Sequence, residues 1–299
     1  MIYRKLGKTK FNVSVVGVGT WQLGGEWGKI YQQDEVNQMI SRAKELGINL
    51  IDTAECYGDR TSEILVGNAI KGQREDWIIA TKFGHKFHKN FERTNHFEPK
   101  EVQKQLEESL RSLQTDYIDL YQFHSGANQD FDNPDLWDML AKQVEAGKIR
   151  AVGLSITNAN PMEQIQKMSE YGISALQIIY NRLSREPESE IFPICQKEDI
   201  GVLTRVPLAS GFLSGKYKPD TQFTNQDDVR SLRNPDEIRQ QLLEVEKIKD
   251  EEVPEGVDMA QWALAWCLHH PTVTAVIPGC KNVEQVEANA KAVELLTVK

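Results

Sequence analysis

Short runs of apolar, often β-branched residues alternate along the chain with longer amphipathic stretches. The apolar runs are nearly continuous, which is typical of parallel strands that are covered on both faces. The eight candidate strands are Ser14–Gly19, Asn49–Asp52, Trp77–Thr81, Ile118–Phe123, Ala151–Ser155, Ala175–Ile179, Val202–Arg205 and Thr274–Ile277. The amphipathic stretches predict helices over Asp34–Leu46, Thr61–Ile70, Lys100–Leu113, Leu136–Glu145, Met162–Tyr171 and Ser189–Lys197.

Eight such units without a break in composition predict a single (β/α)8 TIM-barrel domain over residues 1–299. The alternative is an open, doubly wound sheet, which also alternates strands with helices. The barrel is favoured because no Gly-x-Gly-x-x-Gly motif opens any unit; in 17–22, Gln22 stands at the third glycine position. Residues Met1–Ser14 predict a short β-hairpin that plugs the N-terminal mouth of the barrel. Extra helices are expected between Pro207 and about Pro271, before the eighth strand, and again after that strand.

Composition and charge restrict the classes of partner. The hydrophobic fraction is 40% and the charged fraction 26%, as in ordinary soluble globular chains. The net charge of −9 repels polyanions, so neither nucleic acid nor an anionic membrane is expected as a partner. No run reaches the ~18 apolar residues of a membrane span, and no signal peptide is evident, so we expect a cytoplasmic location. The four cysteines lack the spacing of a zinc site or a disulfide framework.

Polar side chains stand at the ends of most predicted strands. In a barrel, the C-terminal ends of the strands carry the active site. The residues at these ends are Thr20, Asp52, Lys82, His124, Ser155, Gln177, Arg205 and Pro278. A charge at the end of a hydrophobic strand must reach a cleft or a partner, because an unpaired buried ion costs several kcal/mol.

Four residues near these ends could act together in proton transfer. Taken singly, Asp52 could cap a helix and Lys82 could reach solvent. Likewise, His124 could be a core histidine and Tyr57 a packing aromatic. Taken together, an ammonium beside the Tyr57 phenol is expected to lower the pKa of that phenol, and a carboxylate would hold the ammonium in place. With a histidine donating to a carbonyl oxygen, this set suits carbonyl reduction with Tyr57 as the general acid.

The chain resembles the aldo-keto reductase family, and the matching motifs occur in family order over almost its whole length. They are Gly17–Trp21, Asp52–Gly58, Ala80–Lys82, Asp119–His124, Gly153–Ser155, Gln177, Pro207–Lys216 and Ile277–Gly279. The resemblance implies a (β/α)8 fold that binds NADPH, with NAD possible, without a Rossmann motif. It also implies that Tyr57 is the general acid and that Lys82 and Asp52 adjust its pKa. His124 would orient the substrate.

The same resemblance implies the cofactor contacts. Thr20 and Trp21 would lie beside the nicotinamide ribose and the substrate. The carboxamide would be held by Ser155, Asn158 and Gln177. The segment Pro207–Lys216 would wrap the pyrophosphate, through Pro207, Leu208, Ser210, Gly211, Leu213 and Lys216. The adenine and the 2′-phosphate would lie along Gly279–Asn289, against Gln285 and Asn289.

Two positions depart from the family pattern. Arg205 stands where many members place an aromatic residue that stacks on the nicotinamide. Its charge is expected to disfavour the oxidised, cationic ring. Gly279 and Gln285 stand where several members have Lys and Arg for the 2′-phosphate, and Lys281 or Arg230 could replace those cations.

The leading functional prediction is an NADP(H)-dependent oxidoreductase that reduces aldehydes or ketones, or runs in reverse on a sugar or polyol. The alternative is a cofactor-binding regulatory or partner subunit with slow turnover. No metal is expected, because the spacing of His85, His88 and His96 matches no standard site. A small-molecule substrate is expected to bind between Trp21, Trp27, Tyr57 and the Phe83–His96 loop.

Overall fold

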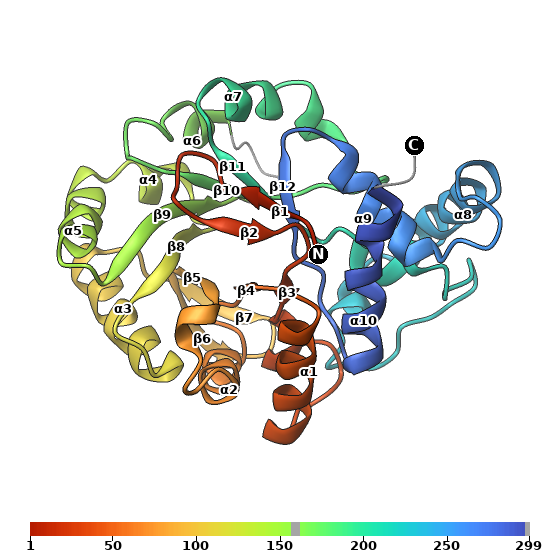
Figure 1. Ribbon diagram of the computed structural model, residues 1–299, viewed down its shortest axis with the longest axis horizontal. Helices are drawn as coiled ribbons and strands as arrows, with labels where there is room; N and C mark the ends of the chain where they lie inside the picture. Colours follow the sequence, from red (N-terminus) through yellow and green to blue (C-terminus); the bar gives the residue numbers. More distant parts are fainter. Residues whose placement is uncertain (157–161, 297–299) are drawn as a thin grey trace.

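The computed structural model describes residues 1–156 and 162–296, and eight parallel strands form its centre (Figure 1). Their order in the sheet is β3 (Val18–Gly19), β4 (Leu50–Asp52), β5 (Ile78–Phe83), β8 (Ile118–His124), β9 (Ile149–Ser155), β10 (Ala175–Ile179), β11 (Gly201–Arg205) and β12 (Val273–Val276). Parallel bridges from Val16 to Val276 and from Gly19 to Gly279 join the two edges. The predicted (β/α)8 barrel is therefore confirmed, and the open sheet is excluded.

Helices surround this sheet. They are α1 (Gln33–Glu45), α2 (Thr61–Ala69), α3 (Pro99–Leu113), α4 (Asn128–Phe131), α5 (Pro134–Glu145), α6 (Met162–Gln166), α7 (Ile191–Lys197), α8 (Pro235–Glu252), α9 (Met259–His269) and α10 (Val283–Lys291). Proline at the first position of α3, α5 and α8 fits the helix start, where its missing N–H has no partner to lose. The predicted extra helices are present as α8 and α9 before β12, and α10 after it. None of the described helices is both long and apolar enough to cross a membrane.

The N-terminal hairpin closes one end of the barrel. Strands β1 (Tyr3–Lys5) and β2 (Asn12–Ser14) pair antiparallel, so the first predicted strand is shortened at its start, where Ser14 pairs with Tyr3. Leu6 and Val13 are fully buried against barrel residues of a second apolar cluster, Leu50, Ala80, Leu120, Ala151, Ala175, Leu203, Ala275 and Ile277. The Arg4 guanidinium donates to the carbonyls of Val273 (2.6 Å) and Leu268 (3.0 Å). This hairpin is the predicted plug.

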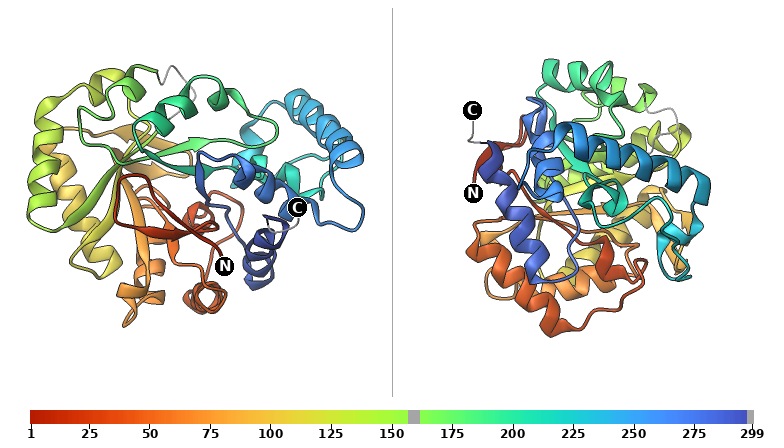
Figure 2. Two further views of the ribbon diagram at one scale, coloured as in Figure 1. Left: turned by 45° about the horizontal axis from the view of Figure 1, so that its top comes forward. Right: turned by 90° about the vertical axis from the view of Figure 1, so that its right-hand side faces the viewer.

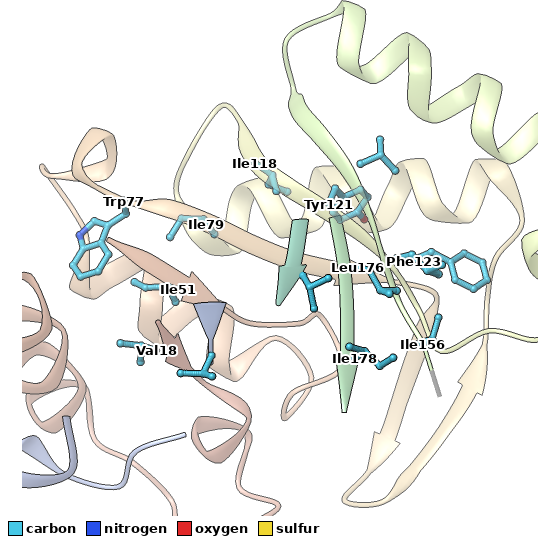
Figure 3. Close-up of a cluster of buried hydrophobic side chains, with 14 of the residues drawn as sticks. Val18, Ile51, Trp77, Ile79, Ile118, Tyr121, Phe123, Ile156, Leu176 and Ile178 are labelled. Carbon is cyan, nitrogen blue, oxygen red and sulfur yellow. The ribbon is translucent and has the colours of Figure 1, made fainter. Parts of the chain in front are cut away.

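The main hydrophobic core lies between the sheet and the helices. Side chains that alternate along the strands, such as Ile51, Ile79 and Tyr121, point out of the barrel into it (Figure 3). A separate apolar cluster joins α8 to the short 3₁₀ segment η4 (Ala209–Ser214) and to α9, around Phe212 and Leu242. Helix α8 stands outside the ring, on the side of α9 and α10 (Figures 1 and 2). Its packing fixes η4 at the rim of the barrel.

The sequence did not predict one hairpin. Strands β6 (His85–Lys89) and β7 (Glu92–Asn95) pair antiparallel within the Phe83–His96 segment, which follows β5. Most of its side chains are exposed, so its order depends on contacts with other segments rather than on its own apolar face. The predicted helix Met162–Tyr171 is also shorter than expected, because α6 ends at Gln166 and turns follow it.

Candidate active site

A cavity of about 390 Å³ opens at the C-terminal ends of the barrel strands. That volume is typical of a small-molecule or cofactor site. The predicted site residues that line it are Thr20, Trp21, Asp52, Tyr57, His124, Gln177, Arg205, Pro207, Leu208, Ser210, Gly211, Lys216, Arg230, Gly279, Lys281, Gln285 and Asn289. Lys82 and Ser155 lie directly behind this lining, and Leu213 is buried in the apolar cluster of α8. Asn158 lies outside the described residues.

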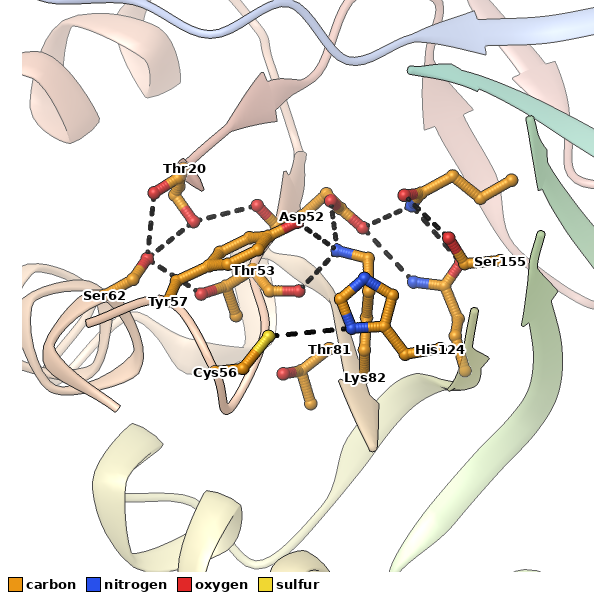
Figure 4. Close-up of polar contacts among 12 residues, drawn as sticks. Thr20, Asp52, Thr53, Cys56, Tyr57, Ser62, Thr81, Lys82, His124 and Ser155 are labelled. Atoms are coloured by element: carbon orange, nitrogen blue, oxygen red, sulfur yellow. Dashed lines mark hydrogen bonds and ion pairs between the residues drawn. The ribbon is translucent and has the colours of Figure 1, made fainter. Parts of the chain in front are cut away.

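The centre of the cavity wall is a hydrogen-bonded set around the Lys82 ammonium (Figure 4). Its Nζ donates to Asp52 Oδ1 (2.7 Å), to the Thr53 carbonyl (2.7 Å) and to the Tyr57 hydroxyl (3.1 Å). All three donor positions of the ammonium are thus used. Lys82 is fully buried, so the ion pair with Asp52 supplies the charge compensation that its burial requires.

The second oxygen of Asp52 is held from across the barrel. Gln177 Nε2 donates to Asp52 Oδ2 at 2.6 Å, and Gln122 Nε2 donates to the same oxygen at 3.2 Å. Ser155 Oγ donates to Gln177 Oε1 at 3.4 Å. These partners come from β8, β9 and β10, so three further strands orient the carboxylate. The sequence analysis missed Gln122, although it lies two residues before His124 and therefore on the same face of β8.

The turn that carries Tyr57 packs closely against the segment that follows β3. Gly58 has a φ of +63°, and a Cβ there would lie 2.6 Å from the Gly24 carbonyl oxygen. A Cβ on Gly24 would lie 2.7 Å from the Tyr57 carbonyl carbon. Only glycine therefore permits this approach, which brings the Trp21 ring to 6.2 Å from the Tyr57 ring, roughly parallel to it. The tyrosine is fixed between Trp21 and Lys82.

Burial dominates the acidity of Tyr57. It raises the pKa of the phenol to about 12, although the Lys82 ammonium acts in the opposite direction. The expected lowering of this pKa is therefore wrong in its net direction, because the desolvation of the phenolate outweighs the attraction of the ammonium. Burial also disfavours the charge of Lys82, but the contacts with Asp52 and Tyr57 raise the pKa of the ammonium above its ordinary value.

His124 is neutral at physiological pH. Burial and then the charges of His85 and Lys82 lower the pKa of its imidazole well below the ordinary value. Nδ1 lies 3.7 Å from Cys56 Sγ, and the ring meets the Tyr57 ring edge-on at 6.2 Å. A neutral imidazole whose Nδ1 faces a thiol can carry its proton on Nε2, as a donor towards a ligand.

A buried carboxylate that the sequence analysis missed ties the β6–β7 hairpin to the cavity. Glu26 has no exposed side-chain surface, and it accepts hydrogen bonds from Trp21 Nε1, from the Arg93 guanidinium and from the Phe91 backbone N–H. Arg93 lines the cavity from the hairpin side. Glu26 lies in a short segment rich in glycine, between Gly25 and Gly28, and no pattern of apolar residues there indicates that it is buried.

The outer part of the cavity combines cations with a turned backbone. In η4, Ser210 (φ 60°) and Gly211 (φ 90°) are both left-handed, a turned conformation that can direct backbone N–H groups at an anion. Lys216 lines the same region. Arg205 enters from the end of β11, where its Nη2 donates to the Ile156 carbonyl at 2.9 Å. Its Nε has no hydrogen-bond partner among the described residues.

The two candidate cations for a 2′-phosphate differ in how many hydrogen-bond and ion-pair partners they already have. Arg230 is paired with Asp228, through Nε (2.9 Å) and Nη2 (2.6 Å), and donates to the Tyr217 hydroxyl (2.8 Å). Among the described residues, the only hydrogen-bond partner of Lys281 Nζ is the Trp27 carbonyl, at 3.4 Å. Burial, and then the charge of Arg230, lower the pKa of this ammonium. Lys281 is the cation with capacity for a further anion, so the cavity fits a dinucleotide phosphate at this end.

Comparisons with known proteins agree with this geometry. Residues 15–299 match the model of the Aldo/keto reductase family. The aldo-keto reductase yakc [NADP(+)] of Schizosaccharomyces pombe is 32% identical over 98% of this chain and 86% of its own length. The holo form of aldo-keto reductase AKR11C1 from Bacillus halodurans superposes with a TM-score of 0.82, at 32% identity over 98% of this chain and 91% of that one. An aldo-keto reductase from Klebsiella pneumoniae, solved in complex with NADPH, gives 0.73 at 26% identity, covering 99% and 91%.

Proposed function

Since the chain belongs to the aldo/keto reductase family, we propose that it reduces a small aldehyde or ketone with NADPH, and that Tyr57 supplies the proton. The observation that carries this proposal is the Lys82 ammonium, 3.1 Å from the Tyr57 hydroxyl and anchored by Asp52 at 2.7 Å. The nicotinamide supplies hydride to the carbonyl carbon when it is bound. The side chains of the site handle the charge that develops on the oxygen.

The residues divide this work between them. His124, neutral and exposed to the cavity, donates a hydrogen bond to the carbonyl oxygen and fixes its position. Tyr57 donates its proton to the oxygen as negative charge accumulates there. The phenolate left behind is stabilised by the Lys82 ammonium, which cannot move because Asp52 and the Thr53 carbonyl hold it. The Trp21 ring covers Tyr57 and limits the access of water.

The acidity of Tyr57 favours the reductive direction near neutral pH. A phenol with a pKa of about 12 is fully protonated near neutral pH, so Tyr57 always carries the proton that it donates. An alkoxide is a stronger base than a phenolate, so proton transfer to it remains downhill. The oxidative direction needs the phenolate, which is scarce at the same pH. We therefore expect carbonyl reduction to be faster than alcohol oxidation near neutral pH.

The phosphate end of the cavity supports NADPH over NADH. Lys281 would hold the 2′-phosphate, with Gln285 and Asn289 beside it, whereas Arg230 would act mainly through its pairing with Asp228. The η4 backbone and Lys216 would hold the pyrophosphate. A Lys281→Ala variant should lose most of the preference for NADPH in kcat/KM, while its activity with NADH stays close to that of the wild type.

The decisive experiment follows NADPH absorbance with 4-nitrobenzaldehyde as substrate. Tyr57→Phe should lower kcat by about 10² to 10⁴, the usual contribution of a general acid, with the affinity for NADPH unchanged. The matched control is Tyr31→Phe. Tyr31 is also buried, its hydroxyl has no partner among the described residues, and it does not line the cavity. Its removal should leave kcat as it is.

Two results would count against the proposal. Equal, negligible rates in wild type and Tyr57→Phe, with NADPH still bound, would favour a cofactor-binding regulatory subunit. A full rate in Tyr57→Phe would assign the proton to another donor. The affinity for NADPH, measured by quenching of tryptophan fluorescence, separates both results from a simple loss of folding, because Trp21 and Trp27 line the cavity.

A further inference from the structure

Three potential metal ligands gather behind the catalytic face of the cavity, and the His85 ring lies next to them. A carboxylate oxygen of Glu55, Cys56 Sγ and a ring nitrogen of His124 all lie within 4.8 Å of one another. The His85 ring lies 5.0 Å from the His124 ring, centre to centre. Asp52, Tyr57 and Lys82 account for the proton transfer proposed above, so Glu55, Cys56 and His85 have no part in it. They form a second set of functional groups, joined to the first through His124.

This cluster is incompletely satisfied. Glu55 is 3% exposed; its Oε1 accepts the His85 backbone N–H at 2.9 Å, but Oε2 has no partner among the described residues. His85 Nδ1 is likewise buried without a partner in the described part of the chain. A buried carboxylate oxygen without a partner is costly. A cation would remove that cost.

The donor types and spacing suit a thiophilic divalent ion. Tetrahedral Zn²⁺ bonds to sulfur at about 2.3 Å and to nitrogen or oxygen at about 2.0–2.2 Å, so its ligands lie about 3.3–3.8 Å apart. Cys56 Sγ and His124 Nδ1 are 3.7 Å apart.

We propose that Glu55, Cys56 and His124 bind one thiophilic divalent cation, of the Zn²⁺ or Cd²⁺ class, with the His85 ring beside them. The Cys56 thiol forms the metal–sulfur bond as its proton leaves to solvent, with no change in oxidation state. Glu55 and His85 also line a second cavity, whose lining residues are not among those of the main cavity.

The neighbouring cations do not prevent this binding, because each has its own carboxylate. Arg93 is paired with Glu26, and Lys82 with Asp52. Ligation through Nδ1 also leaves His124 Nε2 as the nitrogen that faces the cavity. A bound ion would therefore hold His124 in the tautomer that the proposed function requires. That consequence rests on the proposed function, whereas the binding itself does not.

The test is a Cd²⁺ titration of the chelator-treated full chain, followed by the ultraviolet charge-transfer band of a cadmium thiolate. One ion should bind per chain, and Zn²⁺ should displace it and remove the band. Cys56→Ser should abolish the band. Cys280→Ser is the matched control, because this buried cysteine belongs to no ligand cluster in the described residues. It should leave the titration unchanged.

A second variant keeps the proposal testable if Cys56→Ser does not fold. Glu55→Gln retains an oxygen for the His85 N–H but loses the charge, so the band should remain while affinity falls by about tenfold or more. No band with wild type at millimolar Cd²⁺, a band that persists in Cys56→Ser, or unchanged affinity in Glu55→Gln would each overturn the site. The titration involves no turnover, so its failure would leave the proposed function intact, and the failure of Tyr57→Phe to slow reduction would leave the metal site intact.

Discussion

The high pKa of Tyr57 determines which direction of the reaction responds to pH. Carbonyl reduction consumes one proton, so the ratio of oxidation to reduction in kcat/KM must rise about tenfold per pH unit in any enzyme. With a pKa of about 12, Tyr57 is the protonated acid over the whole working range. At pH 7 only about one molecule in 10⁵ carries the phenolate, against about one in 10³ for an ordinary tyrosine. The whole pH dependence of the ratio therefore comes from the kcat/KM for oxidation.

The assay measures kcat/KM in both directions from about pH 6 to pH 10, with saturating cofactor. Oxidation of an alcohol should rise about tenfold per unit without a plateau, and reduction should stay level. The two histidines add no acid limb in this range, because the pKa of His85 is about 4 and that of His124 is also low. Glu55, whose pKa lies near 7, is controlled by repeating the profiles with Glu55→Gln and a chelator.

One result would refute this reasoning. If the reductive rate fell above a break between about pH 7 and pH 10, while oxidation reached a plateau at the same break, Tyr57 would be far more acidic than its burial implies. The Lys82 ammonium would then outweigh the desolvation of the phenolate. A break shared by both directions and removed in Glu55→Gln would instead belong to the carboxyl of Glu55 and would leave the conclusion about Tyr57 unchanged.

Three further substitutions test other parts of the structure. Arg205→Tyr should lower the ratio of the Kd for NADP⁺ to the Kd for NADPH, because a cation beside the nicotinamide opposes the oxidised ring; equal ratios in calorimetric titrations would argue against that placement. Glu26→Gln should lower the free energy of unfolding by about 3 kcal/mol, since it leaves Arg93 partly buried without its anion, and should raise the KM of the carbonyl substrate; urea denaturation with a loss below about 1 kcal/mol would contradict it. Leu6→Ala should cost about 2–5 kcal/mol of stability and leave kcat unchanged, because the fully buried Leu6 lies at the opposite mouth of the barrel; a changed kcat with unchanged urea unfolding would show the reverse.

The barrel could be predicted because its signals are local. Continuous apolar runs mark buried parallel strands, and the residues at their ends are polar because the cavity begins there. Asp52, His124 and Arg205 each end their strand in the structure, and Lys82 lies one residue before the end of β5. In the sheet, β5 lies between β4 and β8, so strand order alone places Lys82 between Asp52 and His124, without any information from loops.

The features that escaped prediction depend on contacts between distant segments. The β6–β7 hairpin has few buried side chains, and it is held by contacts with residues distant in sequence, such as Glu55 and, more than 60 residues earlier, Glu26. The acidity of Tyr57 was misjudged because sequence shows which charges are near a group but not how much water it loses. The burial of Leu213 also escaped prediction, because its cluster includes Leu242 of α8, a segment distant in sequence.

The N-terminal plug also constrains how the molecule is made. The hairpin is synthesised well before residues 268–277, yet Arg4 and Leu6 dock on carbonyls and side chains of those residues. Gly201, where a Cβ would lie 2.5 Å from Leu6, belongs to the late strands as well. During synthesis the hairpin must therefore stay undocked until Leu268, 264 residues after Arg4, has been translated. The bottom of the barrel is sealed only when β12 is present to receive the hairpin.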